Sequence, residues 1–331
     1  MADAARREAC SRCRRPPRVC YCASLPAEPL TAELTHVLVL QHEHEQRRRA
    51  AISSVPVLSK VLTNLTIVVV DNDDCSCGPG ESAELDALLY NVGDTCGFDA
   101  ALLLFPDEHA QPLDAALLAS LPRNNSNASS EPAACGADKR KRVLLVVIDG
   151  TWKEAKKIAH RNRTVWQQTA QRWEQRGAAF RYICLDSTTS HEEPAASERP
   201  CRSIYGELRR EPMEGCLSTL EATAAALLVL EPRETGRQVH DALLHAFRGM
   251  VVIQEQFQQR GRAAKLEMYN GVSKQEAVGA KRLQLLRLEQ QQESRPASQD
   301  TTALRQREYV FYTTLTDFRH RQQLTQQVQQ A

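Results

Sequence analysis

The chain has 331 residues, of which 42% are hydrophobic and 25% are charged, and its formal net charge at pH 7 is +1. This composition is ordinary for a globular protein of one large domain or two modest ones, and the bulk charge gives no sign of a nucleic-acid binder. No run of about 18 apolar residues occurs, and the basic N-terminus lacks an apolar segment, so neither a membrane span nor a secretory signal is expected. We therefore expect the chain to stay in a reducing compartment, in the cytoplasm, the nucleus or both.

Four of the eleven cysteines stand close together near the N-terminus, at Cys10, Cys13, Cys20 and Cys22. In a reducing compartment such a group is better explained by metal binding than by disulfides. Short spacings let four thiolates converge on one tetrahedral Zn²⁺, and metal binding then supplies folding energy to a segment that has little apolar material. The pattern therefore predicts a structural zinc site in residues 1–30. The alternative is four free thiols on a flexible tail.

Five apolar runs rich in β-branched residues predict strands. They are continuous rather than alternating, which is typical of strands buried on both faces of a parallel sheet. Segments with helical character lie between several of them, for example residues 84–91, so the pattern predicts an α/β fold with a mostly parallel sheet and flanking helices. The predicted strands cover residues 34–40, 66–70, 101–105, 143–148 and 180–185.

A polar stretch, residues 41–45 with the sequence Gln-His-Glu-His-Glu, follows the first predicted strand. Adjacent side chains rarely all face one ion, so we expect a loop that presents Gln41 and His42 to a ligand rather than a second metal site. Arg47 belongs to one of several basic clusters that are candidates for contact with nucleic-acid phosphates. The third predicted strand ends at residues 104–106, on the carboxyl edge of the same sheet.

The fourth predicted strand ends at Asp149-Gly150-Thr151-Trp152, where a helix is expected to begin. A carboxylate at the carboxyl end of a parallel strand lies where α/β proteins bind ligands, and Gly150 permits a sharp turn. Asp149 is therefore the leading catalytic candidate, with Thr151 and Trp152 beside it. The alternative is that Asp149 or Thr151 only caps the helix.

The helix predicted at residues 152–161 carries a row of basic side chains at helical spacing, which includes Lys153, Lys156 and Lys157. The row starts at the candidate catalytic turn. Two explanations remain open for it: an ordinary solvated face, or a track for nucleic-acid phosphates.

Two further helices are predicted at residues 217–230 and 239–257. Ser218 and Glu221 have the spacing of a capping box at the start of the first of them. The alternative is that the positive end of this helix holds an anionic group of a ligand, which Glu221 would repel unless its side chain points elsewhere. Residues 258–331 are rich in Gln, Arg and Glu, and we expect surface helices or partial disorder there.

Taken in order, these motifs resemble the DTW-domain family, the tRNA-uridine aminocarboxypropyltransferases. The family's Asp-x-Thr-Trp signature stands here at residues 149–152, its four-cysteine cluster at residues 10–22, and the Gln-His after its first strand at residues 41–42. The chain departs from the common pattern at Glu43, where proline is usual, in an insertion at residues 123–139, and in the Gln-rich tail. A later block also resembles the family's, as Tyr205-x-x-Leu208-Arg209-x-Glu211-Pro212 followed by Leu217-Ser218-Thr219-x-Glu221-Ala222.

The resemblance implies that residues 31–257 form a SPOUT-like α/β domain, a class in which part of the chain can be knotted around the binding site. This domain would lie between the zinc segment of residues 1–30 and a C-terminal extension of residues 258–331. The implied co-substrate is S-adenosylmethionine (SAM), the implied metal is zinc, and the implied partner is tRNA. The implied activity is transfer of the 3-amino-3-carboxypropyl group of SAM to N3 of a uridine, with release of methylthioadenosine. The rivals are a SAM-dependent RNA methyltransferase and a non-catalytic, zinc-containing RNA-binding protein.

A mechanism that fits these residues begins with the N3 proton of uridine, because N3 is a poor nucleophile while it is protonated. Asp149 is expected to help remove this proton, directly or through water. SAM must be held so that the methylene carbon beside the sulfonium, and not the methyl carbon, lies in line with N3. The expected catalytic residues are Asp149, Thr151 and Trp152, the expected SAM contacts are Gln41, His42, Leu104, Pro106, Arg209, Ser218, Thr219 and Glu221, and the expected RNA contacts are Arg47, Lys153, Lys156 and Lys157.

Overall fold

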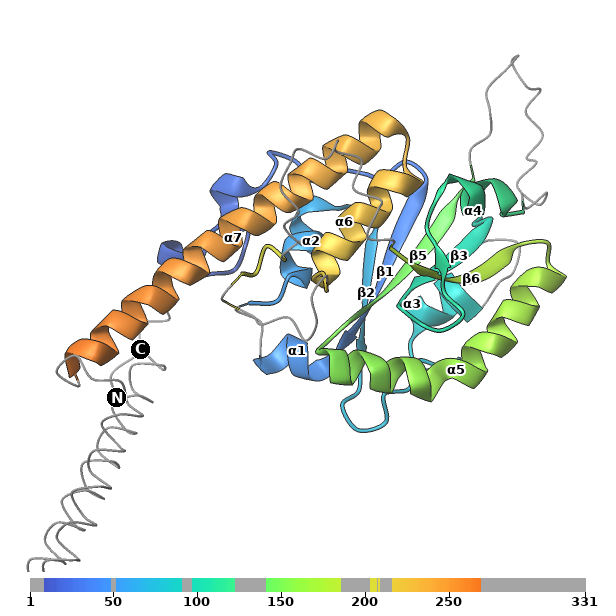
Figure 1. Cartoon of the computed structure of the whole chain (residues 1–331), viewed down its shortest axis with the longest axis horizontal. Helices are drawn as coiled ribbons and strands as arrows, with labels where there is room; N and C mark the ends of the chain where they lie inside the picture. Colours follow the sequence, from blue (N-terminus) through green and yellow to red (C-terminus); the bar gives the residue numbers. More distant parts are fainter. Residues whose placement is uncertain are drawn as a thin grey trace, which may run out of the picture. The chain divides into compact units, whose positions relative to one another are not determined.

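The computed structural model of the chain describes residues 9–48, 52–90, 97–122, 141–185, 203–206, 208 and 216–268. The strands in these residues are β1 (Thr35–His42), β2 (Leu65–Val70), β3 (Ala100–Leu104), β4 (Gln111–Pro112), β5 (Val143–Asp149) and β6 (Ala179–Cys184). They form one six-stranded parallel sheet in the order β2-β1-β5-β3-β6-β4, with helices on both faces (Figure 1). The chain divides into two compact units, Met1–Gln259 and Arg260–Ala331.

The described helices differ greatly in length. Short ones follow or precede strands, whereas three long ones cover the sheet. The α-helices are α1 (Glu43–Arg48), α2 (Val55–Val61), α3 (Ala83–Leu85), α4 (Ala115–Ser120), α5 (Trp152–Gln175), α6 (Thr219–Leu230) and α7 (Arg233–Met268), and two 3₁₀ turns, η1 (Pro17–Val19) and η2 (Cys22–Ser24), and one π turn, η3 (Asp86–Tyr90), accompany them. A search of the described helices finds none that is long and apolar enough to cross a membrane.

Strand β5 occupies the centre of the sheet, because it pairs with β1 on one side and with β3 on the other. Its residues 143–147 are all buried, which explains the unbroken apolar run in the sequence. The register aligns Gln41 of β1 with Asp149 of β5. Two polar side chains are thereby made neighbours at the carboxyl edge of the sheet.

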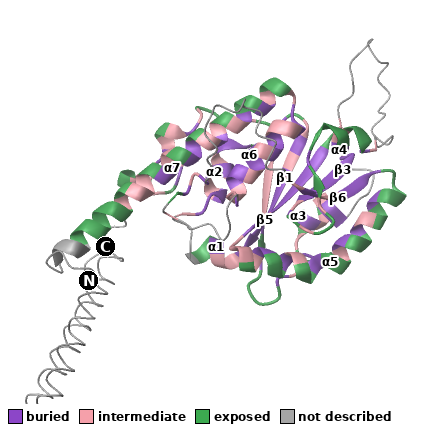
Figure 2. Ribbon diagram, in the orientation of Figure 1, coloured by how far each residue is buried: buried purple, intermediate pink, exposed green. Residues whose placement is uncertain are grey.

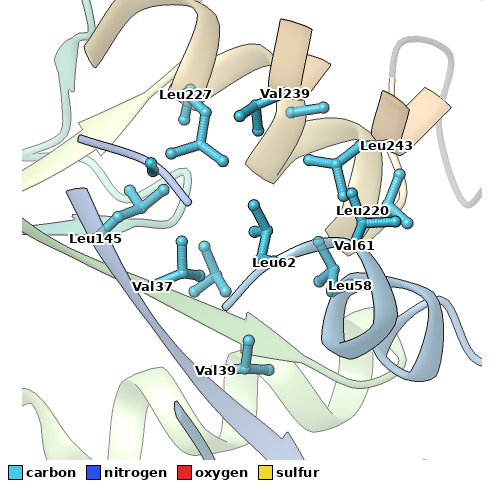
Figure 3. Close-up of a cluster of buried hydrophobic side chains, with 14 of the residues drawn as sticks. Val37, Val39, Leu58, Val61, Leu62, Leu145, Leu220, Leu227, Val239 and Leu243 are labelled. Atoms are coloured by element: carbon cyan, nitrogen blue, oxygen red, sulfur yellow. The ribbon is translucent and has the colours of Figure 1, made fainter. Parts of the chain in front are cut away.

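Alternate residues of each strand point to opposite faces of the sheet and fill two separate cores. Val37, Val39 and Leu145 pack with α2, α6 and α7 on one face, as Figure 3 shows. Leu38 and Leu40 pack with α3 and α5 on the other face. Figure 2 shows the strands buried between the two helical layers, while the outer side of α5 is exposed.

One face of α5 is buried and fixes the loop that follows β2. The buried Asn162 donates a hydrogen bond to the carbonyl oxygen of Cys75 at 2.8 Å and accepts one from the backbone N–H of Cys77 at 2.7 Å. A buried amide that satisfies two backbone groups is a strong local constraint, because each unpaired group would destabilise the fold by about 1–3 kcal/mol. The loop is therefore held against the helix rather than left free.

The parallel sheet with flanking helices confirms the predicted α/β class. The five predicted strands correspond to β1, β2, β3, β5 and β6, with ends that differ by at most two residues. One prediction was wrong: Gln41 and His42 are the last residues of β1 rather than part of a loop, because pairing with β2 continues as far as His42. The insertion predicted at residues 123–139 and the tail beyond residue 268 lie outside the described residues.

Candidate active site and metal centre

A cavity of about 340 Å³ opens at the carboxyl edge of the sheet. It lies where β3, β5 and β6 end and where α5 and α6 begin, which is the usual position of ligand sites in parallel α/β sheets. Leu104 and Pro106 line it from the end of β3, Trp152 lines it from α5, and Thr219 lines it from α6. Four residues predicted from the sequence are therefore brought together around one cavity.

Asp149, the last residue of β5, does not line the cavity but is bonded to a residue that does. It is only 4% exposed. Its Oδ1 accepts a hydrogen bond from Thr219 Oγ1 at 2.7 Å, and its Oδ2 accepts one from Gln41 Nε2 at 2.9 Å. A buried carboxylate needs such donors, because an unpaired buried charge strongly destabilises a fold. The two bonds hold the charge of Asp149 at a fixed place beside the cavity.

Thr151 is the residue that caps α5. Its Oγ1 accepts from the backbone N–H of Glu154, and the carboxylate of Glu154 accepts from the backbone N–H of Thr151 at 2.7 Å, so the pair forms a capping box. Of the two residues considered as caps, Thr151 has this role and Asp149 has other partners. A Cβ added at Gly150 would lie 3.2 Å from Glu154 Cβ and 3.5 Å from His42 Cβ, so the turn leaves little room for a side chain.

Glu154 also joins the turn to the end of β1. Its Oε1 lies 2.9 Å from His44 Nδ1 and 3.9 Å from the Nδ1 of His42, which is 1% exposed. His42 Nδ1 accepts the backbone N–H of His44, so a neutral His42 ring carries its proton on Nε2. Although burial opposes ionisation, the hydrogen bonds from Thr151 and the nearby histidines hold the pKa of Glu154 below its ordinary value.

The structure shows which groups satisfy the charge of Glu221 at the start of α6. Ser218 caps the helix in a capping box with Glu221. The carboxylate of Glu221 also accepts hydrogen bonds from Ser203 Oγ and from the backbone N–H of Ile204, both at 2.7 Å. Its charge is therefore satisfied by its own helix and by residues 203–204, and neither Ser218 nor Glu221 lines the cavity.

The predicted RNA contacts fall into two groups. Lys153 and Lys156 are exposed and make no ion pair with any described residue. Lys157, by contrast, donates to the carbonyl oxygens of Asn72 and Asp73, and Arg47 pairs with Glu43 at 2.7 Å although its side chain is 74% exposed. Arg209 lies outside the described residues.

Several cavity residues were missed by the sequence reasoning. Cys184 and Leu185 line it at the end of β6, and Cys216 and Leu217 line it just before α6. The first pair had a usable signal, because a parallel strand must end at the same edge as β5. Cys216 had no such signal, whereas Leu217 begins the Leu217-Ser218-Thr219 motif and could have been named together with Thr219.

The four N-terminal thiols meet at one place, as the metal site requires. All four Sγ atoms lie within 4.8 Å of one another, and the Cys10–Cys22 and Cys13–Cys20 pairs are each 3.6 Å apart. A tetrahedral zinc ion with Zn–S bonds of about 2.3 Å places its sulfurs roughly 3.8 Å apart, so the donor set fits zinc. Backbone N–H groups of Cys13 and Arg12 lower the pKa of Cys10 to about 6, which favours the thiolate that a metal needs, whereas burial and the neighbouring thiols raise the pKa of Cys22.

The cysteine segment, residues 9–25, packs against α7. Tyr21 is 1% exposed and belongs to the same core as Phe247 and Met250. A Cβ added at Gly249 would lie only 2.0 Å from Ser24 Oγ, so this close approach depends on the absence of a side chain. The segment is therefore held both by its own cysteines and by a tight contact with the helix.

Comparison with known proteins gives a consistent result. The profile of the DTW domain matches residues 7–255. The chain is 26% identical over 253 residues to tRNA-uridine aminocarboxypropyltransferase A of Arabidopsis thaliana, which covers 76% of this chain and 83% of that protein. It is 30% identical over 233 residues to tRNA-uridine aminocarboxypropyltransferase 2 of Macaca fascicularis, covering 70% of this chain and 59% of that protein. No solved structure matches the chain.

Proposed function

Because the chain belongs to the DTW-domain family, we propose that it is a tRNA-uridine aminocarboxypropyltransferase. It transfers the 3-amino-3-carboxypropyl group of SAM to N3 of a uridine in tRNA and releases methylthioadenosine. The observation that carries the proposal is the buried carboxylate of Asp149, which is bonded to the wall of a cavity at the carboxyl edge of the sheet.

The cavity suits SAM in its chemistry. Leu104, Pro106 and Trp152 offer apolar contacts for the adenosyl part, and the hydroxyl-bearing side chain of Thr219 lines the same cavity. The negative charge of Asp149 lies one hydrogen bond away from the cavity, where it favours a ligand with a positive sulfonium. In the proposed site, the wall of the cavity is supported on its far side by Gln41, His42, Ser218 and Glu221. Arg209 remains a candidate for binding the SAM carboxylate or an RNA phosphate.

The chemistry depends on two things that the protein must do. It must remove the N3 proton, and we propose that Asp149 is the group that finally takes it. It must also hold SAM so that the methylene carbon beside the sulfonium, rather than the methyl carbon, faces N3. Trp152 shapes the cavity for this orientation, and Thr151 holds the turn that carries Trp152.

We also propose a role for the cysteine cluster, a fold class for the domain, an RNA-binding side and a cellular compartment. The four cysteines hold a structural zinc ion, because four thiolates leave no open coordination position. Residues 31–257 form a SPOUT-like domain, a proposal supported by the parallel sheet and by the contact of α6 with the end of β5. Arg47, Lys153, Lys156 and Lys157 lie on the RNA side of the site. The protein works in the cytoplasm, the nucleus or both.

The test is mass spectrometry of nucleosides from tRNA incubated with the purified protein and SAM. We expect a uridine that carries an aminocarboxypropyl group, together with methylthioadenosine in equal amount. The matched control is Asp149→Asn, which keeps the size of the side chain but removes its charge, and it should yield little product. A methylated nucleoside would instead identify an RNA methyltransferase. Binding of tRNA without any gain in mass would identify a non-catalytic binding protein.

A further inference from the structure

The hydroxyl of Thr219 links the cavity to the buried carboxylate of Asp149. Thr219 is the first residue of α6 and lines the cavity. Its Oγ1 donates its proton to Asp149 Oδ1 at 2.7 Å. A hydroxyl that donates in this way keeps its lone pairs for a second hydrogen bond. Thr219 therefore contributes an acceptor oxygen whose own proton already points at a carboxylate.

The geometry around Asp149 keeps this arrangement in place. Gln41 donates to the other carboxylate oxygen at 2.9 Å, and the register of β1 and β5 fixes Gln41 beside Asp149. Asp149 is 4% exposed, so bulk water has little access to its charge. Thr223, one turn further along α6, donates to the backbone carbonyl of Thr219 at 2.7 Å and helps to hold the first turn.

We propose that Thr219 is the residue that touches the target uridine and that Asp149 acts through it. The N3–H of the base donates to Thr219 Oγ1, and the hydroxyl passes its own proton to Asp149. This relay rests on the function proposed above and deepens it, because it names the group in contact with the base. Thr219 is then a catalytic residue, and Asp149 is the proton acceptor behind it.

The proton and the electrons balance in a single step. The N3–H bond breaks while N3 bonds to the methylene carbon of the aminocarboxypropyl group. The bond between that carbon and the sulfonium sulfur breaks, and its electron pair stays on sulfur in methylthioadenosine. Thr219 Oγ1 gains the N3 proton and gives its former proton to Asp149 Oδ1, so the hydroxyl is restored. The step removes the positive sulfonium and the negative carboxylate together, which is favourable where water is scarce.

Three variants, two on α6 and one on α5, test the relay. Thr219→Val keeps the shape of the side chain but removes the hydroxyl, so we expect kcat to fall by about 10²–10⁴, the usual contribution of a proton-transfer group. The dissociation constant of SAM should change by less than about threefold, because the relay contacts the base. Thr219→Ser restores the hydroxyl and should recover most of kcat. Thr169→Val is the control, since it removes an equally buried hydroxyl that donates to a backbone carbonyl, that of Val165, on α5 and away from the relay.

The dependence on pH separates a lost relay from a damaged fold. Without the relay, Thr219→Val can use only uridine that has already lost its N3 proton to solvent, so its kcat should rise in proportion to hydroxide concentration. The wild-type rate should rise less steeply, because the relay supplies the base. A defect in folding or packing would not vary with pH in this way.

The relay is wrong if Thr219→Val keeps kcat within about threefold of wild type. It is also wrong if the variant loses affinity for SAM while kcat is unchanged, because Thr219 would then hold SAM rather than the base. Equal inactivity of Thr219→Ser and Thr219→Val would point to packing and would overturn the relay as well. The wild type is assayed in parallel, and absence of product from the wild type would overturn the proposed function itself.

Discussion

The cysteine segment and the carboxyl edge of the sheet hold their functional side chains in different ways. In the cysteine segment four thiols converge within 4.8 Å, but the segment contains only two 3₁₀ turns and a small apolar contact with α7. At the sheet edge Asp149 and Gln41 are the ends of paired strands whose inner residues are fully buried. We expect the first region to depend on a bound metal for much of its order, whereas buried paired strands hold the second.

Because of this difference, substitutions in the cysteine segment should mainly affect stability, and substitutions at the sheet edge should mainly affect chemistry. Removing a metal ligand should change whether the cysteine segment has a structure at all. Removing a polar group from the sheet edge should leave the strands in place, because apolar burial rather than that group holds them. The predictions that follow test this division, and they run from the largest expected effect to the smallest.

Replacement of one of the four clustered cysteines should have the largest effect on stability. Structural zinc binding contributes on the order of 10 kcal/mol in small domains, so Cys13→Ser should abolish stoichiometric zinc and markedly lower the midpoint of thermal unfolding. The measurements are metal content by atomic emission and unfolding with and without a chelator. Cys77→Ala is the control, because Cys77 is buried but lies outside the cluster. Full zinc content in Cys13→Ser would contradict the assignment.

The contact between the cysteine segment and α7 should be the next most sensitive. Gly249→Ala places a methyl group 2.5 Å from Ser24 Cβ, and such overpacking destabilises a protein by about 1–3 kcal/mol. Denaturant unfolding measures this loss, and Ser24→Gly in the same chain should restore stability. Gly261→Ala is the matched control on α7, since an added Cβ there meets nothing. An unchanged Gly249→Ala protein would mean that the segment does not rest on this helix.

The capping box at the turn after β5 should give a smaller, pH-dependent effect. Because the pKa of Glu154 is lowered in the fold, its contribution is present above the ordinary glutamate pKa and is lost as pH falls through the lowered value. Glu154→Gln should therefore be less stable than wild type by about 1 kcal/mol at pH 7, and the difference should vanish in acid. Thermal unfolding across pH checks this, and a constant difference would contradict it.

The smallest effects are expected on the outer side of α5. Lys156 makes no ion pair with a described residue, so Lys156→Ala should weaken tRNA binding uniformly and reduce the salt dependence of affinity by about one phosphate contact. Lys157 is already bonded to the loop after β2, so Lys157→Ala should alter tRNA binding less. Fluorescence anisotropy over a series of salt concentrations distinguishes them. A larger loss of tRNA affinity in Lys157→Ala than in Lys156→Ala would mean that Lys157 leaves the loop and binds RNA.

The sequence predicted the buried parts of the fold well. Strands β1, β3 and β5 are buried along almost their whole length and appear as continuous apolar runs, so they were found. β2 and β6 are only partly buried, but their apolar residues were still enough to predict them. β4 has two exposed residues, one of them proline, and carries no such signal. Helices α1 and α4 are too short for a helical period to emerge, although Ser54 before Pro56 was a usable signal for the start of α2.

The candidate site was predicted in its parts but not in its connections. Asp149 was chosen as a candidate because it ends a buried strand, and Thr219 because it belongs to a recognisable motif. That Gln41 and Thr219 both donate to Asp149 was not foreseen. β1 and β5 are adjacent in the sheet although β2, β3 and β4 lie between them in the sequence. A single sequence does not reveal such a strand order.

The central place of β5 has a consequence for synthesis on the ribosome. β1 and β2 emerge early and can pair, but the other side of β1 stays open until Val143–Asp149 has left the exit tunnel. At about 5–20 residues per second the nascent chain therefore carries an unpaired strand edge for several seconds. Thr219 emerges later still. The site can therefore form only after residue 219 has left the tunnel, because Asp149 Oδ1 is bonded to Thr219.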